Sequence, residues 1–179
     1  PTNFVGGVSQ ENWDRYNNSD SSYAPLMNRC IAGQYPAAST FKAFTGLAAL
    51  NYGFASSSTS WNCSGTWTGF GEAYAQKCWL TTGHGAIDLR RGIVVSCDVV
   101  FYEIAKNFYD ASSKIGDDAM QNYIKEFGLG SKTGIELPDE AQGVIPTPEW
   151  KKEYFRNAPE EGQWQPGDMT NMVIGQGNV

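Results

Sequence analysis

The sequence predicts a helix-rich fold with a minor β component, and two features carry this prediction. Apolar residues recur at helical spacing in several segments of the chain. Residues 55–82, by contrast, are dense in Ser, Gly, Thr and Trp and nearly lack Val, Ile and Leu. This composition predicts a long loop or a short hairpin that carries aromatic residues.

The first elements are expected in the following order. The first 35 residues are rich in Asn, Ser, Asp and Gly, which predicts irregular structure with one short helix at residues 10–17. A longer helix then begins around Ser39 and ends at Gly53. The apolar stripe of this helix consists of Phe41, Phe44, Leu47, Ala48 and Leu50.

Four more helices are expected after residues 55–82, over residues 88–95, 99–109 and 117–127 and from Thr147 onward. Gly128 is a plausible C-terminal stop for the third of them. Pro148 and Glu149 are typical of a first helical turn, so they support the start at Thr147. A length of 179 residues fits one core of ordinary size, and a single domain is therefore expected.

The segment Ser39-Thr40-Phe41-Lys42 places a hydroxyl and an amine one helical turn apart. Residues at i and i+3 share a helix face, so Lys42 can reach Ser39 and take its proton during attack on a carbonyl. Free backbone N–H groups at a helix start also favour the negative charge of an oxyanion. By itself the segment is more often a serine cap followed by a solvated lysine, so other motifs must decide.

A second polar motif, Ser96-Cys97-Asp98, lies between two predicted helices, where its side chains can point into a cleft. Together, the two motifs resemble those of the penicillin-binding protein transpeptidases, in particular the monofunctional, elongation-type class B enzymes. That family carries Ser-x-x-Lys, then Ser-x-Asn or Ser-x-Asp, then Lys-Thr-Gly. Further similar segments follow in order along the chain, at residues 83–85, 101–102, 127–138, 147–152 and 167–177.

The resemblance implies an α+β fold of the serine β-lactamase and D,D-transpeptidase type. Residues 1–179 are expected to form a partial transpeptidase domain, cut at both ends, with mostly the helical part and little of the antiparallel sheet. Lys132-Thr133-Gly134 spells the third motif but is interpreted as a decoy, because it precedes Ile135 in a connector. In the family, the catalytic copy lies on a strand downstream of the Gly-Gln-Gly segment, so it is expected beyond Val179.

The resemblance also implies the role of each catalytic residue in a peptidoglycan D,D-transpeptidase. Ser39 would attack the penultimate D-Ala carbonyl of a stem peptide, and Lys42 would accept its proton. Ser96 would relay a proton to the leaving nitrogen, while Asp98 would hold Lys42 and the substrate. An amine from a neighbouring stem would then resolve the acyl-enzyme and form a crosslink.

Two neighbouring residues, Thr40 and Cys97, are expected at the substrate-binding surface. Asp98 stands where many relatives have Asn, which is interpreted as tuning and not as loss of function. The missing Lys-Thr-Gly strand would supply one donor of the oxyanion hole, and losing such a donor costs about a hundredfold or more in turnover. The chain is therefore expected to be weak or inactive alone.

Two alternatives remain open at the level of sequence. A β-lactamase or β-lactam sensor would share the fold and the first motifs, although the long connector and the Gly-Gln-Gly segment favour the transpeptidase. A noncatalytic scaffold for cell-wall synthesis proteins, such as a polymerase, would use the helical body alone. Retention of cellular function after Ser39→Ala would favour the scaffold.

The charge pattern restricts the possible partners. The net charge is −6, without a basic run, which disfavours nucleic-acid binding. The expected partners are stem peptides, β-lactam antibiotics and cell-wall synthesis proteins, with no cofactor. The resemblance implies a parent protein on the extracytoplasmic face, anchored by an N-terminal transmembrane helix outside this chain.

The four cysteines and the one histidine leave several readings open. Cys63 and Cys78 could form a disulfide or remain as two reduced, buried thiols, and neither is favoured. Zinc binding by these two with His84 is disfavoured because a fourth ligand is not evident, so no metal site is assigned. His84 is interpreted as a turn residue, and Cys30 and Cys97 as unpaired.

Overall fold

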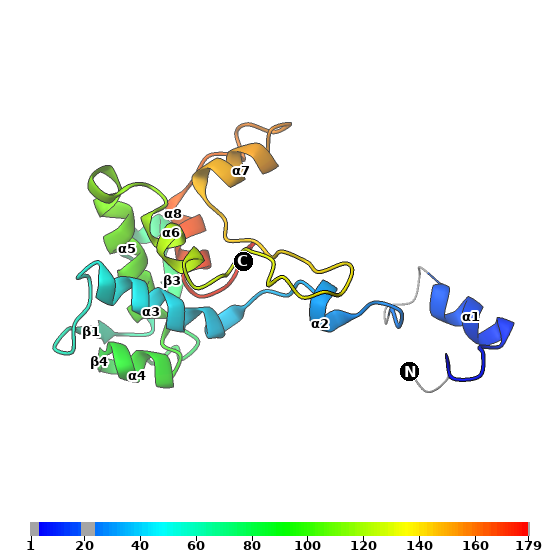
Figure 1. The fold of residues 1–179 in the computed structure, drawn as a ribbon. Coiled ribbons are helices and arrows are strands. Elements are labelled where there is room, and N and C mark those ends of the chain that lie inside the picture. Colours follow the sequence, from blue (N-terminus) through cyan, green and yellow to red (C-terminus); the bar gives the residue numbers. More distant parts are fainter. Residues whose placement is uncertain (1–3, 19–23, 179) are drawn as a thin grey trace. The chain divides into compact units, whose positions relative to one another are not determined.

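The structure, a computed structural model, describes residues 4–18 and 24–178, which form two compact units (Figure 1). The smaller unit comprises residues 1–34 and 134–142. It contains α1 (Gln10–Asn17) and α2 (Arg29–Ala32), and the backbone N–H of Ala141 donates to the carbonyl of Ile31 at 2.7 Å. The helix expected at residues 10–17 is confirmed.

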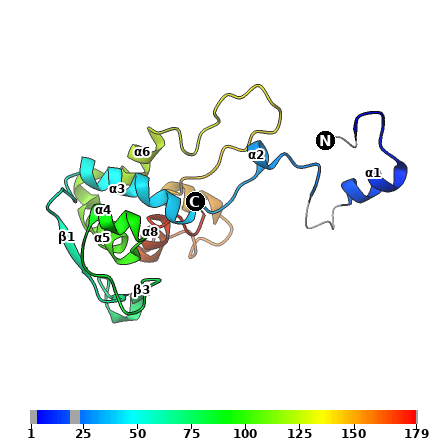
Figure 2. The same ribbon diagram turned by 90° about the horizontal axis from the view of Figure 1, so that it is seen from below.

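The larger unit comprises residues 35–133 and 143–179. Its helices are η2 (Ala38–Phe41), α3 (Lys42–Asn51), η3 (Glu72–Tyr74), α4 (Leu89–Val94), α5 (Asp98–Ile115), α6 (Ala119–Lys125), α7 (Pro148–Tyr154) and α8 (Pro166–Met172). Helix α5 packs against α3, α4, α6 and α8, as the two views in Figures 1 and 2 agree. It is the central element around which these four helices gather.

Two small antiparallel sheets complete the larger unit. Strand β1 (Ser60–Cys63) pairs with β4 (Gly85–Asp88), with Cys63 opposite Gly85. Strand β2 (Thr66–Trp67) pairs with β3 (Gln76–Lys77), which gives the region expected as a loop or hairpin its short hairpin. The resulting composition, many helices and little sheet, is the one that the sequence predicts.

A close backbone approach holds this region together near β1. A Cβ atom at Gly65 would lie 1.9 Å from the carbonyl oxygen of Thr81, and one at Gly83 would lie 2.2 Å from that of Cys63. Both glycines also have positive φ angles, of 93° and 81°. Only glycine fits such contacts in this conformation, and the approach brings His84 next to Cys63.

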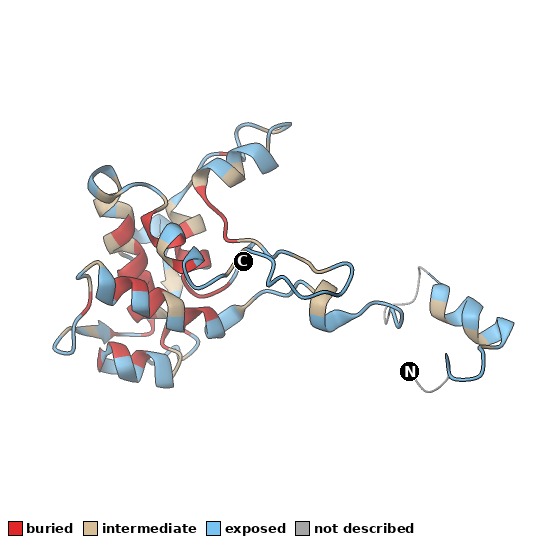
Figure 3. Ribbon diagram, in the orientation of Figure 1, coloured by how far each residue is buried: buried red, intermediate tan, exposed pale blue. Residues whose placement is uncertain are grey.

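The core of the larger unit lies along α5 and the helices that cover it (Figure 3). Two features of the helix predicted from Ser39 to Gly53 need correction. Ser39 lies in the short 3₁₀ segment η2 and not in the α-helix that follows. Leu47 and Leu50 are 42% and 46% exposed, whereas Thr45 and Ala49 are fully buried.

These differences have a common cause in the way α3 packs. Phe41 and Ala48 are buried as predicted, but α3 contacts α5, α6 and α4. A helix covered on several sides selects buried positions by its neighbours and not by apolar spacing alone. Helix α5 continues to Ile115, beyond the expected end.

The later helices follow the sequence closely. Met120 and Ile124 of α6 are fully buried, although Phe127 after it is 47% exposed. Helix α7 begins as expected, with the Thr147 hydroxyl accepting a hydrogen bond from the backbone N–H of Trp150. Among the described residues, no helix combines the length and the apolar character that a membrane crossing requires.

Candidate active site

The predicted nucleophile, Ser39, is exposed at the start of η2. The preceding residue, Ala38, has a φ of +49°, a left-handed conformation that costs a residue with a Cβ atom free energy. Its backbone N–H donates to the carbonyl of Gly175 at 2.8 Å, which holds this turn in place. The strained turn presents the Ser39 hydroxyl away from the core.

The Lys42 side chain is almost completely buried, at 1% exposure, one turn beyond Ser39. Its ammonium donates to the Ser96 carbonyl at 3.0 Å, the Ser96 hydroxyl at 2.9 Å and Oδ1 of Asp98 at 2.6 Å. These three acceptors match the three donors of an ammonium group. A buried charge with this set of partners is compensated on every side.

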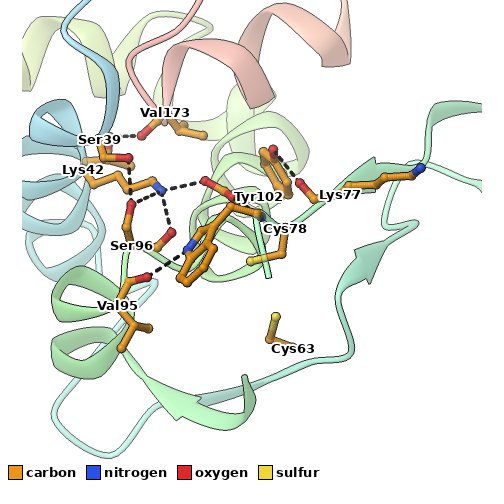
Figure 4. A network of polar contacts seen from close by, with 12 residues as sticks. Ser39, Lys42, Cys63, Lys77, Cys78, Val95, Ser96, Tyr102 and Val173 are labelled. Atoms are coloured by element: carbon orange, nitrogen blue, oxygen red, sulfur yellow. Dashed lines mark hydrogen bonds and ion pairs between the residues drawn. The ribbon is translucent and has the colours of Figure 1, made fainter. Parts of the chain in front are cut away.

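Ser96 connects the buried lysine to the exposed serine. Its hydroxyl donates to the Ser39 hydroxyl at 2.7 Å and accepts from Lys42 (Figure 4). The hydrogen-bonded path from Lys42 to Ser39 thus runs through Ser96. The structure therefore brings all four predicted catalytic residues together, with Ser96 between the two that the sequence places face to face.

Asp98 is the first residue of α5, where the helix dipole favours a carboxylate. Its Oδ1 accepts from Lys42, and its Oδ2 accepts from the backbone N–H of Trp79 at 2.9 Å. The indole N–H of Trp79 reaches the Val95 carbonyl at the same distance. Sequence reasoning missed Trp79, because a tryptophan in a loop carries no signal for this contact.

The C-terminal end of α8 supports the same site from another side. The buried hydroxyl of Thr45 in α3 donates to the Val173 carbonyl at 2.9 Å. Gly175 belongs to the segment at residues 167–177, for which the sequence gives a family resemblance but no role. Its carbonyl accepts a hydrogen bond from the backbone N–H of Ala38, next to Ser39. The structure thus adds a supporting role for this segment.

The two residues expected to bind substrate lie differently from each other. Thr40 is exposed, and its hydroxyl donates to the Ala37 carbonyl. Cys97 is fully buried, and burial raises the pKa of its thiol to about 12. Its thiol is therefore not available to a substrate in the solvent beside Ser39.

The Cys97 thiol instead belongs to a cluster of four side chains, together with Cys63, Cys78 and His84. The four ligand atoms lie within 4.8 Å of one another, and Nδ1 of His84 lies 3.6 Å from both Cys63 Sγ and Cys78 Sγ. In a tetrahedral zinc site, metal–ligand bond lengths place nitrogen and sulfur ligands about 3.6 Å apart. Three sulfurs and one imidazole nitrogen form a common structural zinc site.

The cluster decides between the two alternatives for Cys63 and Cys78 and corrects the interpretation of His84. All four cysteines are free thiols, so Cys63 and Cys78 are not joined as a disulfide. The His84 ring contacts sulfur, and its buried Nε2 has no hydrogen-bond partner, so backbone groups do not satisfy it as expected of a turn residue. The candidate for the fourth ligand is Cys97, which the sequence does not reveal because it belongs to the Ser96-Cys97-Asp98 motif.

The local electrostatics favour the thiolate form at one cysteine of this cluster, Cys63, and oppose it at Cys97. Burial raises the pKa of the Cys63 thiol, whereas hydrogen bonds, among them those from the backbone N–H groups of His84 and Gly65, lower it. The hydrogen bonds outweigh burial, so the net pKa of this thiol is below its ordinary value. A metal requires thiolate ligands, and this shift favours one. Within residues 4–18 and 24–178, these four residues are the group that can hold a metal ion.

Comparison with known proteins identifies relatives along nearly the whole chain. A family model described as penicillin binding protein transpeptidase domain matches residues 6–165. The peptidoglycan D,D-transpeptidase MrdA of Acinetobacter baumannii is 32% identical over 177 residues, which cover 99% of this chain and 24% of that protein. The MrdA of Haemophilus influenzae is 36% identical over 97% of this chain and 25% of its own length.

Solved structures agree with these relatives. Pseudomonas aeruginosa PBP2, solved in complex with WCK 5153, has a TM-score of 0.79 at 30% identity and is matched over 96% of this chain and 36% of its own. Helicobacter pylori PBP2, in a complex with MreC, has a TM-score of 0.80 at 31% identity, and the match covers 97% of this chain and 30% of that protein chain. The chain spans about a quarter of the length of the curated relatives it matches.

Proposed function

This chain belongs to the penicillin-binding protein transpeptidase domain family, and from this premise we propose that its site forms an acyl-enzyme at Ser39 with peptidoglycan stem peptides. The observation that carries the proposal is the path from buried Lys42 through the Ser96 hydroxyl to the exposed Ser39 hydroxyl. Such a path joins a nucleophile to a base without exposing the base to water.

The first step is attack of Ser39 on the carbonyl of the penultimate D-Ala residue. A hydroxyl both donates and accepts, so the path can run toward the amine form of Lys42. Ser39 passes its proton to Ser96, and Ser96 passes its own proton to Lys42. The resulting ammonium is stabilised by Asp98, whose Oδ1 lies 2.6 Å from the Lys42 nitrogen.

The second half of the reaction uses the same groups in reverse. The proton on Lys42 returns through Ser96 to the leaving nitrogen as the carbonyl–nitrogen bond breaks, and the terminal D-Ala departs. An amine of a neighbouring stem then attacks the ester of Ser39. The new amide bond crosslinks the two stems as the bond between the acyl carbon and the Ser39 oxygen breaks, and the proton lost by the amine passes to that oxygen and restores the Ser39 hydroxyl.

The names of the relatives support the substrate class and the setting. The MrdA relatives are named peptidoglycan D,D-transpeptidases, which supports D-Ala-D-Ala stem peptides as substrates. The family description, penicillin binding protein transpeptidase domain, supports β-lactams as inhibitors. Helicobacter pylori PBP2 binds MreC, which supports cell-wall synthesis proteins as partners. Peptidoglycan lies outside the cytoplasm, so the site belongs on the extracytoplasmic face, in a protein held there by a membrane anchor.

Intact-mass spectrometry after incubation with a penicillin tests this proposal. The protein, as its gene encodes it, is expected to gain the mass of one whole penicillin, because ring opening releases no leaving group. Ser39→Ala should remove the adduct entirely. An adduct that persists in this variant, or none in the unchanged protein, would contradict the proposal. Rapid release of hydrolysed penicillin would favour a β-lactamase instead.

A further inference from the structure

Trp79 holds the second catalytic motif from both of its sides. Its backbone N–H donates to Oδ2 of Asp98, and its indole N–H donates to the carbonyl of Val95, each at 2.9 Å. The acceptors, at Asp98 and Val95, lie just after and just before the Ser96-Cys97 pair. The indole ring also contacts His84 edge-on, with 5.4 Å between the ring centroids.

The geometry points to Trp79 as a positioning residue for the acyl transfer proposed above, on which this inference rests. Ser96 has a φ of +54°, a conformation that costs free energy in a residue with a Cβ atom and persists only when its surroundings hold it. Both the carbonyl and the hydroxyl of Ser96 accept from Lys42. A shift of this turn would therefore displace two of the three Lys42 acceptors and the link to Ser39.

The backbone bond of Trp79 also explains why a carboxylate stands at position 98. Lys42 donates to one oxygen of Asp98, and Trp79 donates to the other. A carboxylate offers an acceptor to each, whereas an amide offers one acceptor and one donor group. Asp98 can therefore accept from Lys42 and from the Trp79 backbone N–H at the same time.

The indole bond can be tested separately from the fold. The Trp79 side chain is 62% exposed, so it gains little from burial and its removal leaves no cavity in the core. An exposed ring beside a nucleophile could instead serve as a surface on which substrate stacks. Stacking of a substrate would require the area of the ring, whereas positioning of the motif requires the indole N–H group.

Replacement of Trp79 by β-(3-benzothienyl)alanine separates these roles, because sulfur replaces the N–H while the shape of the ring is kept. Trp79→Phe removes the same donor with natural amino acids. For each variant, the acylation of Ser39 by a penicillin is followed over a range of concentrations. This yields the dissociation constant of the initial complex and the rate constant of acylation. Trp13→Phe, a change at a 44% exposed tryptophan of the smaller unit, is the matched control.

Loss of a neutral hydrogen bond that orients the motif predicts an acylation rate constant about three- to tenfold lower in both Trp79 variants. The dissociation constant of the initial complex should be unchanged in both Trp79 variants. In the Trp13→Phe control, both constants should equal those of the unchanged protein. An unchanged rate constant would overturn the positioning role, and so would an effect confined to the dissociation constant, which would indicate a stacking surface. If the unchanged protein is not acylated, the proposed function fails, and the role of Trp79 in it fails as well.

Discussion

The carbonyl oxygen of Gly175 accepts a hydrogen bond of 2.8 Å from the backbone N–H of Ala38, the residue before the nucleophile. The contact joins segments from opposite ends of the larger unit. Gly175 has a φ of +71°, and a Cβ atom there would lie 2.1 Å from the Ala38 carbonyl oxygen. Only a glycine lets the backbone come this close, so this contact sets the position of Ser39.

Gly175→Ala should therefore impair acylation more than it impairs folding. The clash involves backbone on both sides, so the Ser39 turn must move, and a displacement of about 1 Å can cost about a hundredfold in rate. Acylation by a penicillin measures the effect. Gly177→Ala is the matched control, because its φ is also positive, at 80°, but its nearest contact is Asn171 at 3.8 Å. Equal acylation rates in the two variants would rule out this explanation.

Asp98→Asn should slow acylation although it is nearly isosteric. An amide at this position cannot accept hydrogen bonds from both Lys42 and the Trp79 N–H. Loss of the hydrogen bond from the Trp79 N–H costs about 0.5–1.5 kcal/mol, which corresponds to a rate lower by about two- to tenfold. Asp110→Asn, at an exposed surface ion pair with Lys106, should leave the rate unchanged. A fully active Asp98→Asn protein would argue against the two-donor arrangement.

Thr45→Val should destabilise the larger unit without a change in volume. The Thr45 hydroxyl is fully buried and donates to the Val173 carbonyl, which would then lose this partner. The expected loss is about 1–3 kcal/mol in the free energy of unfolding, measured by urea denaturation. Thr66→Val, at an exposed position of β2, is the control and should cost less than about 0.5 kcal/mol. Similar losses in both variants would contradict the role of this bond.

The cysteine and histidine cluster predicts one zinc ion per chain. Elemental analysis of protein purified without chelators should find it, and His84→Ala should lower the content, because four ligands would become three. A chelator should also lower the melting temperature, since metal bound to the native state stabilises it. Cys30→Ala, at an exposed cysteine outside the cluster, should retain the metal. Metal-free protein with four reactive thiols would contradict this prediction.

Much of the fold follows from local sequence signals. The helix start at Thr147, the helix at residues 10–17 and the helical turn between Ser39 and Lys42 depend on caps, proline and spacing within a few residues. Apolar spacing was a weaker guide, because Leu47 and Leu50 proved to be exposed. The neighbours of α3 decide which of its faces is covered, and those neighbours come from distant parts of the chain.

The sequence by itself determined which groups the candidate site contains: Ser39, Lys42, Ser96 and Asp98, and the order in which they occur. Only the tertiary structure decided how these groups connect. The path through Ser96, the two donors facing Asp98, the contact at Gly175 and the fourth ligand Cys97 all join residues far apart in the chain. Local propensities act over a few residues, whereas these contacts arise when the helices and short strands pack around α5.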